Sequence, residues 1–302
     1  SVPFRGGDVI VTTRADYVSN QIQYLALADR FGVEVLRAPD APGGGVDLSA
    51  MEGLIHRRRP RVVAVTHVPT NSGLVQDVAA IGRMCRARDV LYLVDACQSV
   101  GQMPVRPDEI GCDFLSATSR KFLRGPRGAG FLWVSDRALD AGLAPLFPDL
   151  RGADWVEGDL FQPAPDARRF ETWEFAWALV LGTGAAARYA QAVGLDAVQD
   201  RVRALAATLR TRLPELPGVR VLDRGPELSA IVTVAVAGRD PAALVDALRE
   251  RGINTSSQTR LDAVLDYDDK GVDGALRISP HYYNTEQELE TLLSALGEIL
   301  EA

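Results

Sequence analysis

Lysine is scarce in this 302-residue chain, and the position of one lysine suggests covalent chemistry. Arginine supplies nearly all of the 33 basic side chains, and the two lysines are Lys121 and Lys270. A lysine amine can lose its proton and form a Schiff base with an aldehyde, whereas a guanidinium stays charged. Lys270 lies among acidic residues and is expected in a solvated loop. Lys121 is therefore the candidate for attaching an aldehyde cofactor, with an ordinary surface lysine as the alternative.

A candidate acidic partner for Lys121 ends an apolar segment upstream. Residues 90–94 are apolar and are followed by Asp95, a pattern typical of a buried parallel strand that ends in a carboxylate. A second apolar segment, 112–117, leads to Thr118 and Lys121. Ligand crevices lie outside the carboxyl ends of parallel strands, so the acid and the amine are predicted at one crevice. There Asp95 can pair with the ring nitrogen of pyridoxal 5′-phosphate (PLP), although a strand-end Asp can also be a helix cap.

The motifs around these residues resemble the class V aminotransferase family of PLP-dependent enzymes. The resemblance rests on Asp95-Ala96-Cys97-Gln98, on Thr118-Ser119-Arg120-Lys121 and on the following Gly125-Pro126-Arg127-Gly128. It continues through residues 64–73, 169–171 and 277–285 and covers essentially the whole chain. The family includes cysteine desulfurases, isopenicillin N epimerase-like proteins, kynureninases and the sulfoxide lyase of ergothioneine biosynthesis. The resemblance implies an α/β protein of PLP fold type I, with a mainly parallel sheet of the seven-stranded type and a smaller α+β C-terminal domain.

The resemblance also implies which residues hold the cofactor. Lys121 would form the Schiff base and move the Cα proton of the substrate. Asp95 would bind the pyridine nitrogen and Gln98 the phenolic oxygen, although Gln98 could instead cap a helix. Thr118 and Arg120 would contact the phosphate.

Further residues would face the ring and the substrate. Tyr17 matches the position that stacks on the ring, with an ordinary packing aromatic as the alternative. Thr70 or Asn71 would face the ring, and spacing does not choose between them. Arg277 matches the arginine that binds the α-carboxylate of the substrate, unless it is a surface residue of an edge strand. Thr172 would lie near the phosphate of the partner subunit, and His67 is expected to be a hydrogen-bonded strand-end histidine without a catalytic role.

The chain departs from the family pattern at two places. It begins where relatives have completed roughly a quarter of the domain, so we expect the large domain to lack its N-terminal part, including a phosphate-binding turn. Gly43-Gly44-Gly45 is expected to be a linker and not a substitute for that turn. Residues 254–262 contain no cysteine where desulfurases carry a persulfide nucleophile, which argues against a persulfide mechanism.

Composition excludes several other classes of protein. The formal net charge of −7 and the low isoelectric point argue against a surface for nucleic acid or anionic membranes. Apolar segments are too short to span a membrane. Three cysteines without framework spacing fit a reducing cytoplasm, and the sequence predicts no metal site.

Apolar periodicity predicts a large domain over 1–165, an interdomain helix within 166–194 and a small domain over 195–302. Residues 142–166 are expected to be irregular. The predicted strands are 9–11, 33–36, 62–66, 90–94, 112–117, 131–134, 219–222, 230–236, 253–256 and 276–279. The predicted helices are 19–31, 48–58, 75–87, 175–192, 195–213, 241–251 and 285–300, the last with a capping box of Thr285 and Glu288.

These observations predict a homodimeric PLP enzyme with shared active sites, acting on an amino acid as a lyase (C–S or related β-elimination) or an aminotransferase. An epimerase resembling isopenicillin N epimerase, or a non-catalytic binding or regulatory protein with this fold, is the alternative. The substrate and the choice among these reactions depend on contacts that the sequence does not specify.

Overall fold

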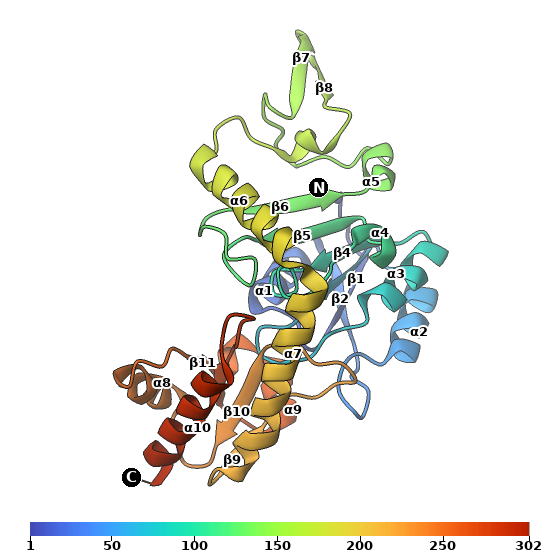
Figure 1. Cartoon of the computed structure of the whole chain (residues 1–302). Coiled ribbons are helices and arrows are strands. Elements are labelled where there is room, and N and C mark those ends of the chain that lie inside the picture. The colour runs from blue at the N-terminus through green and yellow to red at the C-terminus, as the bar shows by residue number, and fades with distance from the viewer. Residues whose placement is uncertain (302) are drawn as a thin grey trace.

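The computed structural model describes residues 1–301 and contains a mainly parallel six-stranded sheet in the order β2-β1-β3-β4-β5-β6 (Figure 1). The first five strands are parallel to one another, and β6 is antiparallel to β5. The chain lays β2 on one side of β1 and β3 on the other, which creates a switch point at the β1/β3 boundary. The strands are β1 (Val9–Thr13), β2 (Glu34–Ala38), β3 (Val62–Thr66), β4 (Leu91–Asp95), β5 (Phe114–Thr118) and β6 (Gly130–Val134).

Side-chain alternation buries both faces of this sheet. Val63 and Val65 pack in one core with Ile55 and Ile81, from α2 and α3, whereas Ala64 packs in another core with Tyr24 of α1. A parallel sheet covered on both faces requires such continuous apolar strands. The helices are α1 (Val18–Phe31) on one face, and α2 (Leu48–Arg58), α3 (Val78–Ala87) and the short α4 (Pro107–Ile110) on the other (Figure 1).

The C-terminal part of the chain forms an antiparallel four-stranded sheet in the order β11-β12-β10-β9. Its core is built from Val232 and Val234 of β10 together with apolar side chains of three helices. Thr285 and Glu288 form the predicted capping box, since each accepts a backbone N–H of the other. The elements are β9 (Val219–Val221), β10 (Val232–Val236), β11 (Ser256–Thr259), β12 (Gly274–Ile278), α7 (Leu195–Arg212), α8 (Pro241–Glu250), α9 (Val264–Lys270) and α10 (Glu286–Glu301).

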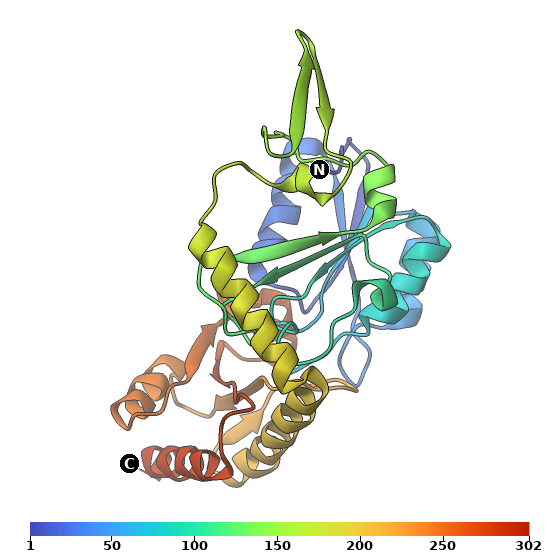
Figure 2. The same ribbon diagram turned by 45° about the horizontal axis from the view of Figure 1, so that its top comes forward.

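The part of the chain that links the two sheets forms a projecting hairpin and a long helix (Figure 2). The hairpin consists of β7 (Ala153–Glu157) and β8 (Leu160–Pro163), joined through Gly158-Asp159, and it projects beyond the large sheet. The prediction that residues 142–166 are irregular is therefore wrong for these two strands. After the short helices α5 (Asp136–Asp140) and η1 (Ala167–Phe170), α6 (Trp177–Val193) leads to the second sheet with all of its side chains at least partly exposed.

Other sequence expectations shift by a few residues or fail. The helix predicted from residue 75 begins at Val78, because the Asp77 carboxylate caps it by accepting the Ala80 N–H. The strand predicted over 253–256 is β11, Ser256–Thr259. The solvated loop predicted around Lys270 is wrong: Lys270 ends α9 and is buried against Asp266, with 2.6 Å between the amine and the carboxylate.

Within the part of the chain that the structure describes, no helix combines the length and the apolar character needed to cross a membrane.

Gly73 lies where the loop after β3 meets the second sheet. Its N–H donates to Asp223, a fully buried carboxylate that also accepts hydrogen bonds from Arg210 and Thr233. A Cβ atom at residue 73 would stand 2.3 Å from Arg210 Nη2 and 2.4 Å from the Ile231 carbonyl oxygen. Only glycine allows this approach, so Gly73 fixes how the loop sits against the C-terminal sheet.

Gly73→Ala is expected to destabilise the protein by about 1–3 kcal/mol, because the added methyl group must displace backbone and a buried ion pair. Chemical denaturation measures the change. Gly43→Ala is the matched control, since nothing lies within 4 Å of its added Cβ, and it should leave stability unchanged or slightly raised. Equal effects of the two substitutions would contradict the packing role of Gly73.

Candidate active site

Three adjacent strands end at one cavity of about 210 Å³. Thr66, Asp95 and Thr118 are the last residues of β3, β4 and β5, and Lys121 follows in the turn after β5. Parallel strands present their carboxyl ends at the same edge of the sheet, so the register brings these side chains together. The cavity is lined by Tyr17, Thr66, Val68, Thr70, Asp95, Cys97, Gln98, Thr118, Arg120 and Lys121.

Hydrogen bonds hold the buried carboxylate of Asp95 in one orientation. One oxygen accepts the Cys97 N–H at 2.9 Å, and the other accepts the side-chain amide of Asn20 at 3.0 Å. Asn20 also donates to Asp16, whose carboxylate accepts the N–H of Tyr17. Within residues 1–301, no cationic side chain pairs with Asp95. An oriented carboxylate without a cation suits the protonated nitrogen of a pyridine ring.

Thr70 joins two groups at the wall of the cavity. Its hydroxyl oxygen accepts the Gln98 amide at 3.0 Å and the Arg277 guanidinium at 2.7 Å, which leaves the hydroxyl proton free to be donated. Gln98 is buried, and among the described residues its Oε1 atom has no partner. A buried amide oxygen without a partner carries a desolvation cost that a bound polar group would offset.

The structure distinguishes Thr70 from Asn71, which spacing could not. Thr70 lines the cavity, whereas the Asn71 amide donates to Asp266 on α9 at 2.7 Å. Asn71 therefore does not face the cavity, and that alternative is wrong.

Cations outnumber anions around the cavity. Burial lowers the pKa of Lys121 to about 8, and the charges of Arg277 and Arg120 add to this effect. Burial likewise lowers the pKa of Arg277 to about 10. In the described part of the chain, neither arginine has an acidic partner within 4.0 Å. Such a site favours anionic ligands, because bound anions restore the lost neutralisation.

Cys97 is a cavity residue that the sequence analysis did not assign to the site. It lines the cavity beside Asp95, and burial together with that carboxylate raises the pKa of its thiol to about 12. The thiol is therefore protonated and a weak nucleophile. Asn20 and Thr66 were also missed; Asn20 lies in the first turn of α1, and its amide donates to Asp16, which precedes the helix.

Two further expectations fall outside the cavity. Thr172 lines a separate groove with Phe131 and Trp177, and its hydroxyl donates to the Glu174 carbonyl. His67 is buried, and burial lowers the pKa of its ring to about 4. The expected hydrogen bonds of His67 are incomplete, since Nδ1 has no partner within residues 1–301.

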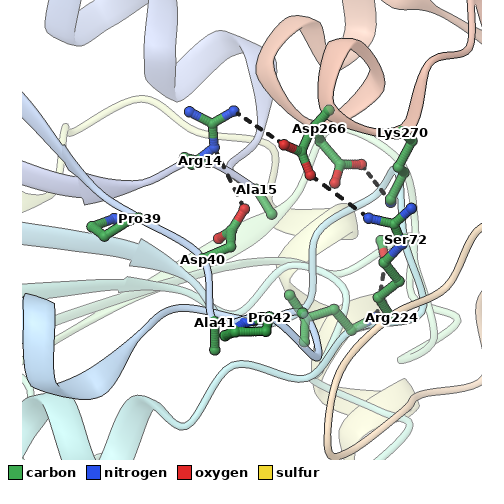
Figure 3. A pocket seen from close by; sticks show the side chains of 14 residues that line it. Arg14, Ala15, Pro39, Asp40, Ala41, Pro42, Ser72, Arg224, Asp266 and Lys270 are labelled. Carbon is green, nitrogen blue, oxygen red and sulfur yellow. Dashed lines mark hydrogen bonds and ion pairs between the residues drawn. The ribbon is translucent and has the colours of Figure 1, made fainter.

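A second, larger cavity of about 430 Å³ lies at the ends of β1 and β2 (Figure 3). Its acids and bases pair with one another: Lys270 with Asp266 at 2.6 Å, and Arg14 with Asp40 at 3.6 Å. Burial raises the pKa of Asp40 to about 6. Because these charges are mutually paired, this cavity lacks the excess of cations that marks the first one. Gly44 and Gly45 line it, so this glycine segment is part of a packed turn and not a free linker.

Comparison with known proteins agrees with this arrangement. The sequence model of the aminotransferase class-V family matches residues 1–292. A probable cysteine desulfurase of Xylella fastidiosa is 30% identical over 301 residues, which cover 98% of this chain and 70% of that protein. A probable cysteine desulfurase of Methanothermobacter thermautotrophicus is also 30% identical, over 98% of this chain and 74% of the relative.

Solved structures confirm the predicted fold. The apo cysteine desulfurase of Thermococcus onnurineus superimposes with a TM-score of 0.91 at 26% identity, over 99% of this chain and 74% of that one. The Escherichia coli cysteine desulfurase CsdA gives a TM-score of 0.90 at 24% identity, over 99% and 73% of the two chains. The family match, the type I fold and a cavity with an amine, an oriented carboxylate and unpaired cations agree, and the chain belongs to the class-V aminotransferase family of PLP-dependent enzymes.

Proposed function

We propose that this chain binds PLP in the 210 Å³ cavity through Lys121 and cleaves a bond of an amino-acid substrate there. The observation that carries this proposal is one small cavity lined by an amine with a lowered pKa, a carboxylate without a cationic partner and Arg120, with Arg277 bound to the cavity residue Thr70. Bound PLP withdraws electrons from the substrate, so that a bond at Cα becomes labile. The roles below are what the chain's own residues would do.

Asp95 would hold the ring nitrogen, because Asn20 and the Cys97 N–H already fix its carboxylate. Gln98 and the Thr70 hydroxyl would hydrogen-bond the ring substituents, since both retain unused capacity at the cavity wall. Tyr17, at the N-terminal end of α1, would stack on the ring.

Thr118 and Arg120 would bind the phosphate. Arg120 has the bidentate geometry that suits a phosphate dianion, and an acidic partner is missing from its surroundings in residues 1–301.

Lys121 would attach the cofactor and then carry a proton on Nζ. A general base works best when its pKa lies near the working pH, and a pKa of about 8 meets that condition. Arg277 would bind the α-carboxylate of the substrate, with the Thr70 hydroxyl holding the guanidinium in place at 2.7 Å.

We propose a C–S lyase as the reaction type. Several relatives are named cysteine desulfurases, which supports a sulfur-containing amino acid as the substrate class. The segment 254–262 has no cysteine, and Cys97 at the cavity is held as a thiol. Release of a sulfur leaving group from the substrate requires no protein persulfide, so elimination fits these residues better than sulfur transfer to a protein thiolate.

We also propose a homodimer in which each subunit completes the site of the other. Large apolar side chains are exposed on the hairpin, on the loop before it and on α6, including Phe147 at 85%, Trp155 at 80% and Leu181 at 71%. Exposed apolar surface on this scale is typical of a subunit interface. Thr172, in the groove beside α6, would lie near the phosphate of the partner's site. The acidic net charge supports a small-molecule enzyme without nucleic-acid or membrane partners, and three free cysteines support a reducing cytoplasm.

Attachment of PLP to the apoprotein should accelerate with pH and level off above about 8, because only the neutral Lys121 amine attacks the aldehyde. An unperturbed lysine would level off near 10.5. Borohydride trapping followed by peptide mapping measures the rate at Lys121. Arg277→Gln should move the midpoint upward, since its charge depresses the pKa of Lys121, and the distant Arg224→Gln should not. A wild-type midpoint near 10.5, or an adduct elsewhere, would contradict the assignment.

Arg277→Ala is expected to weaken binding of an amino acid by about 2–5 kcal/mol and to leave its amide nearly unaffected. The reason is that only the amino acid carries the carboxylate that Arg277 would pair with. Titration of the holoenzyme with L-alanine and L-alaninamide, followed by the absorbance of the bound cofactor, gives both dissociation constants. Equal losses for the two ligands would refute the carboxylate role.

Leu181→Asp is expected to convert the protein from dimer to monomer, because it places a charge within the exposed apolar surface of α6. Light scattering measures the molecular mass. Leu261→Asp changes an equally exposed leucine (72%) in the C-terminal part and should leave the dimer intact. A wild-type monomer with full activity would rule out the shared-site dimer.

A further inference from the structure

The turn that carries Lys121 is tied to the segment after β12 by an exposed arginine that contacts three tyrosines. The Arg124 guanidinium lies 5.0 Å from the ring centre of Tyr283, 5.6 Å from that of Tyr189 and 5.7 Å from that of Tyr282. It also donates a 2.7 Å hydrogen bond to the Tyr282 hydroxyl. A cation over several aromatic rings is held by cation–π attraction from each of them. We call these four residues the Arg124 clamp.

The backbone of Arg124 adopts a conformation that favours glycine. Its φ angle is +61°, in the left-handed region, where a Cβ atom carries a steric cost. The conformation closes a tight turn in which the Arg124 N–H donates to the Lys121 carbonyl at 2.9 Å. Gly125 is the next residue, so glycine is available to this segment, yet arginine occupies the strained position. The contacts of the guanidinium must offset the steric cost.

A second set of contacts joins the same two segments. His281 Nε2 donates to the Phe122 carbonyl at 3.0 Å, and the two rings stack with centres 5.4 Å apart. His281 Nδ1 accepts the N–H of Tyr282, which fixes the tautomer, and burial lowers the pKa of the ring so that it stays neutral. His281 in turn stacks on Tyr283 at 4.7 Å. His281, Tyr282 and Tyr283 thereby contact Phe122 or Arg124, which follow Lys121 in the chain.

The 281–283 segment follows β12, which carries Arg277. The two groups proposed to act on one substrate, the Lys121 amine and the Arg277 guanidinium, therefore come from segments that the clamp joins. The Thr70 hydrogen bond fixes Arg277 from the large sheet, and the clamp fixes β12 to the Lys121 turn. Two separate attachments restrain Arg277 relative to Lys121, because a single hydrogen bond would leave rotation about it free.

We propose that Arg124 is a positioning residue that sets the separation of Lys121 and Arg277 and thereby the recognition of the substrate carboxylate. This inference rests on the proposed function, because it takes Arg277 as the carboxylate-binding residue. The alternative is that this cluster only stabilises the protein surface. The strained backbone of Arg124 argues for the positioning role.

Arg124→Gly removes the guanidinium contacts and relieves the left-handed backbone, so the two effects should largely cancel and thermal stability should change little. The preference of the holoenzyme for L-alanine over L-alaninamide should nevertheless fall by about 3- to 10-fold. Hydrogen exchange should accelerate in residues 274–283, which is a readout independent of turnover. Tyr282→Phe, which removes only the hydrogen-bond acceptor, should shift the preference in the same direction by a smaller factor.

Arg127→Gly is the matched control. It makes the same substitution in the same turn, and in the described residues the Arg127 side chain has no ion pair within 4.0 Å. It should change neither ligand preference nor exchange. An unchanged preference in Arg124→Gly, with a large loss in Arg277→Ala, would overturn the clamp and leave the proposed function intact. An unchanged preference in Arg277→Ala would overturn both.

Discussion

The Thr70 hydroxyl is a hydrogen-bonded contact between the two sheet-containing parts of the chain, and it lies at the cavity. It accepts the Gln98 amide from the large sheet and the Arg277 guanidinium from the C-terminal sheet. Its position depends on the rest of its loop, in which Asn71 is bound to Asp266 and Gly73 to Asp223. If this loop were held loosely, the cavity wall at Thr70 and the Arg277 guanidinium would move independently of each other. The Asn71 and Gly73 hydrogen bonds therefore help to hold the Thr70 hydroxyl in place.

Electrostatics at the cavity follow from what the fold leaves unpaired. The ion pairs around Asp113, Asp223 and Asp266 neutralise buried acids within the protein. Lys121 and Arg277 receive no such neutralisation from residues 1–301, and both have lowered pKa values. Buried uncompensated charge destabilises the folded state, so the chain carries such a cost at this site. A phosphate and a carboxylate would remove it, which couples ligand binding to stability.

Cavity residues that lie at the ends of buried strands could be predicted from the sequence. Asp95 and Thr118 end buried parallel strands, so their convergence with Lys121 was predictable from apolar runs and the geometry of parallel sheets. The same reasoning stopped at loops. The choice between Thr70 and Asn71 depends on where α9 lies, and no local pattern encodes that contact. The β7–β8 hairpin was missed because its apolar residues are exposed and show no core-facing alternation.

The two lysines show why residue type alone cannot assign chemistry. Both are retained in a chain that otherwise uses arginine, and the structure leaves both substantially shielded from water. Lys270 has a carboxylate 2.6 Å away, which stabilises its charged form and makes it structural. Burial, with the charges of Arg277 and Arg120, destabilises the charged form of Lys121 and favours the neutral amine. The scarcity of lysine pointed to Lys121 only in combination with Asp95, because burial and neighbouring charges determine whether a lysine amine can act as a nucleophile.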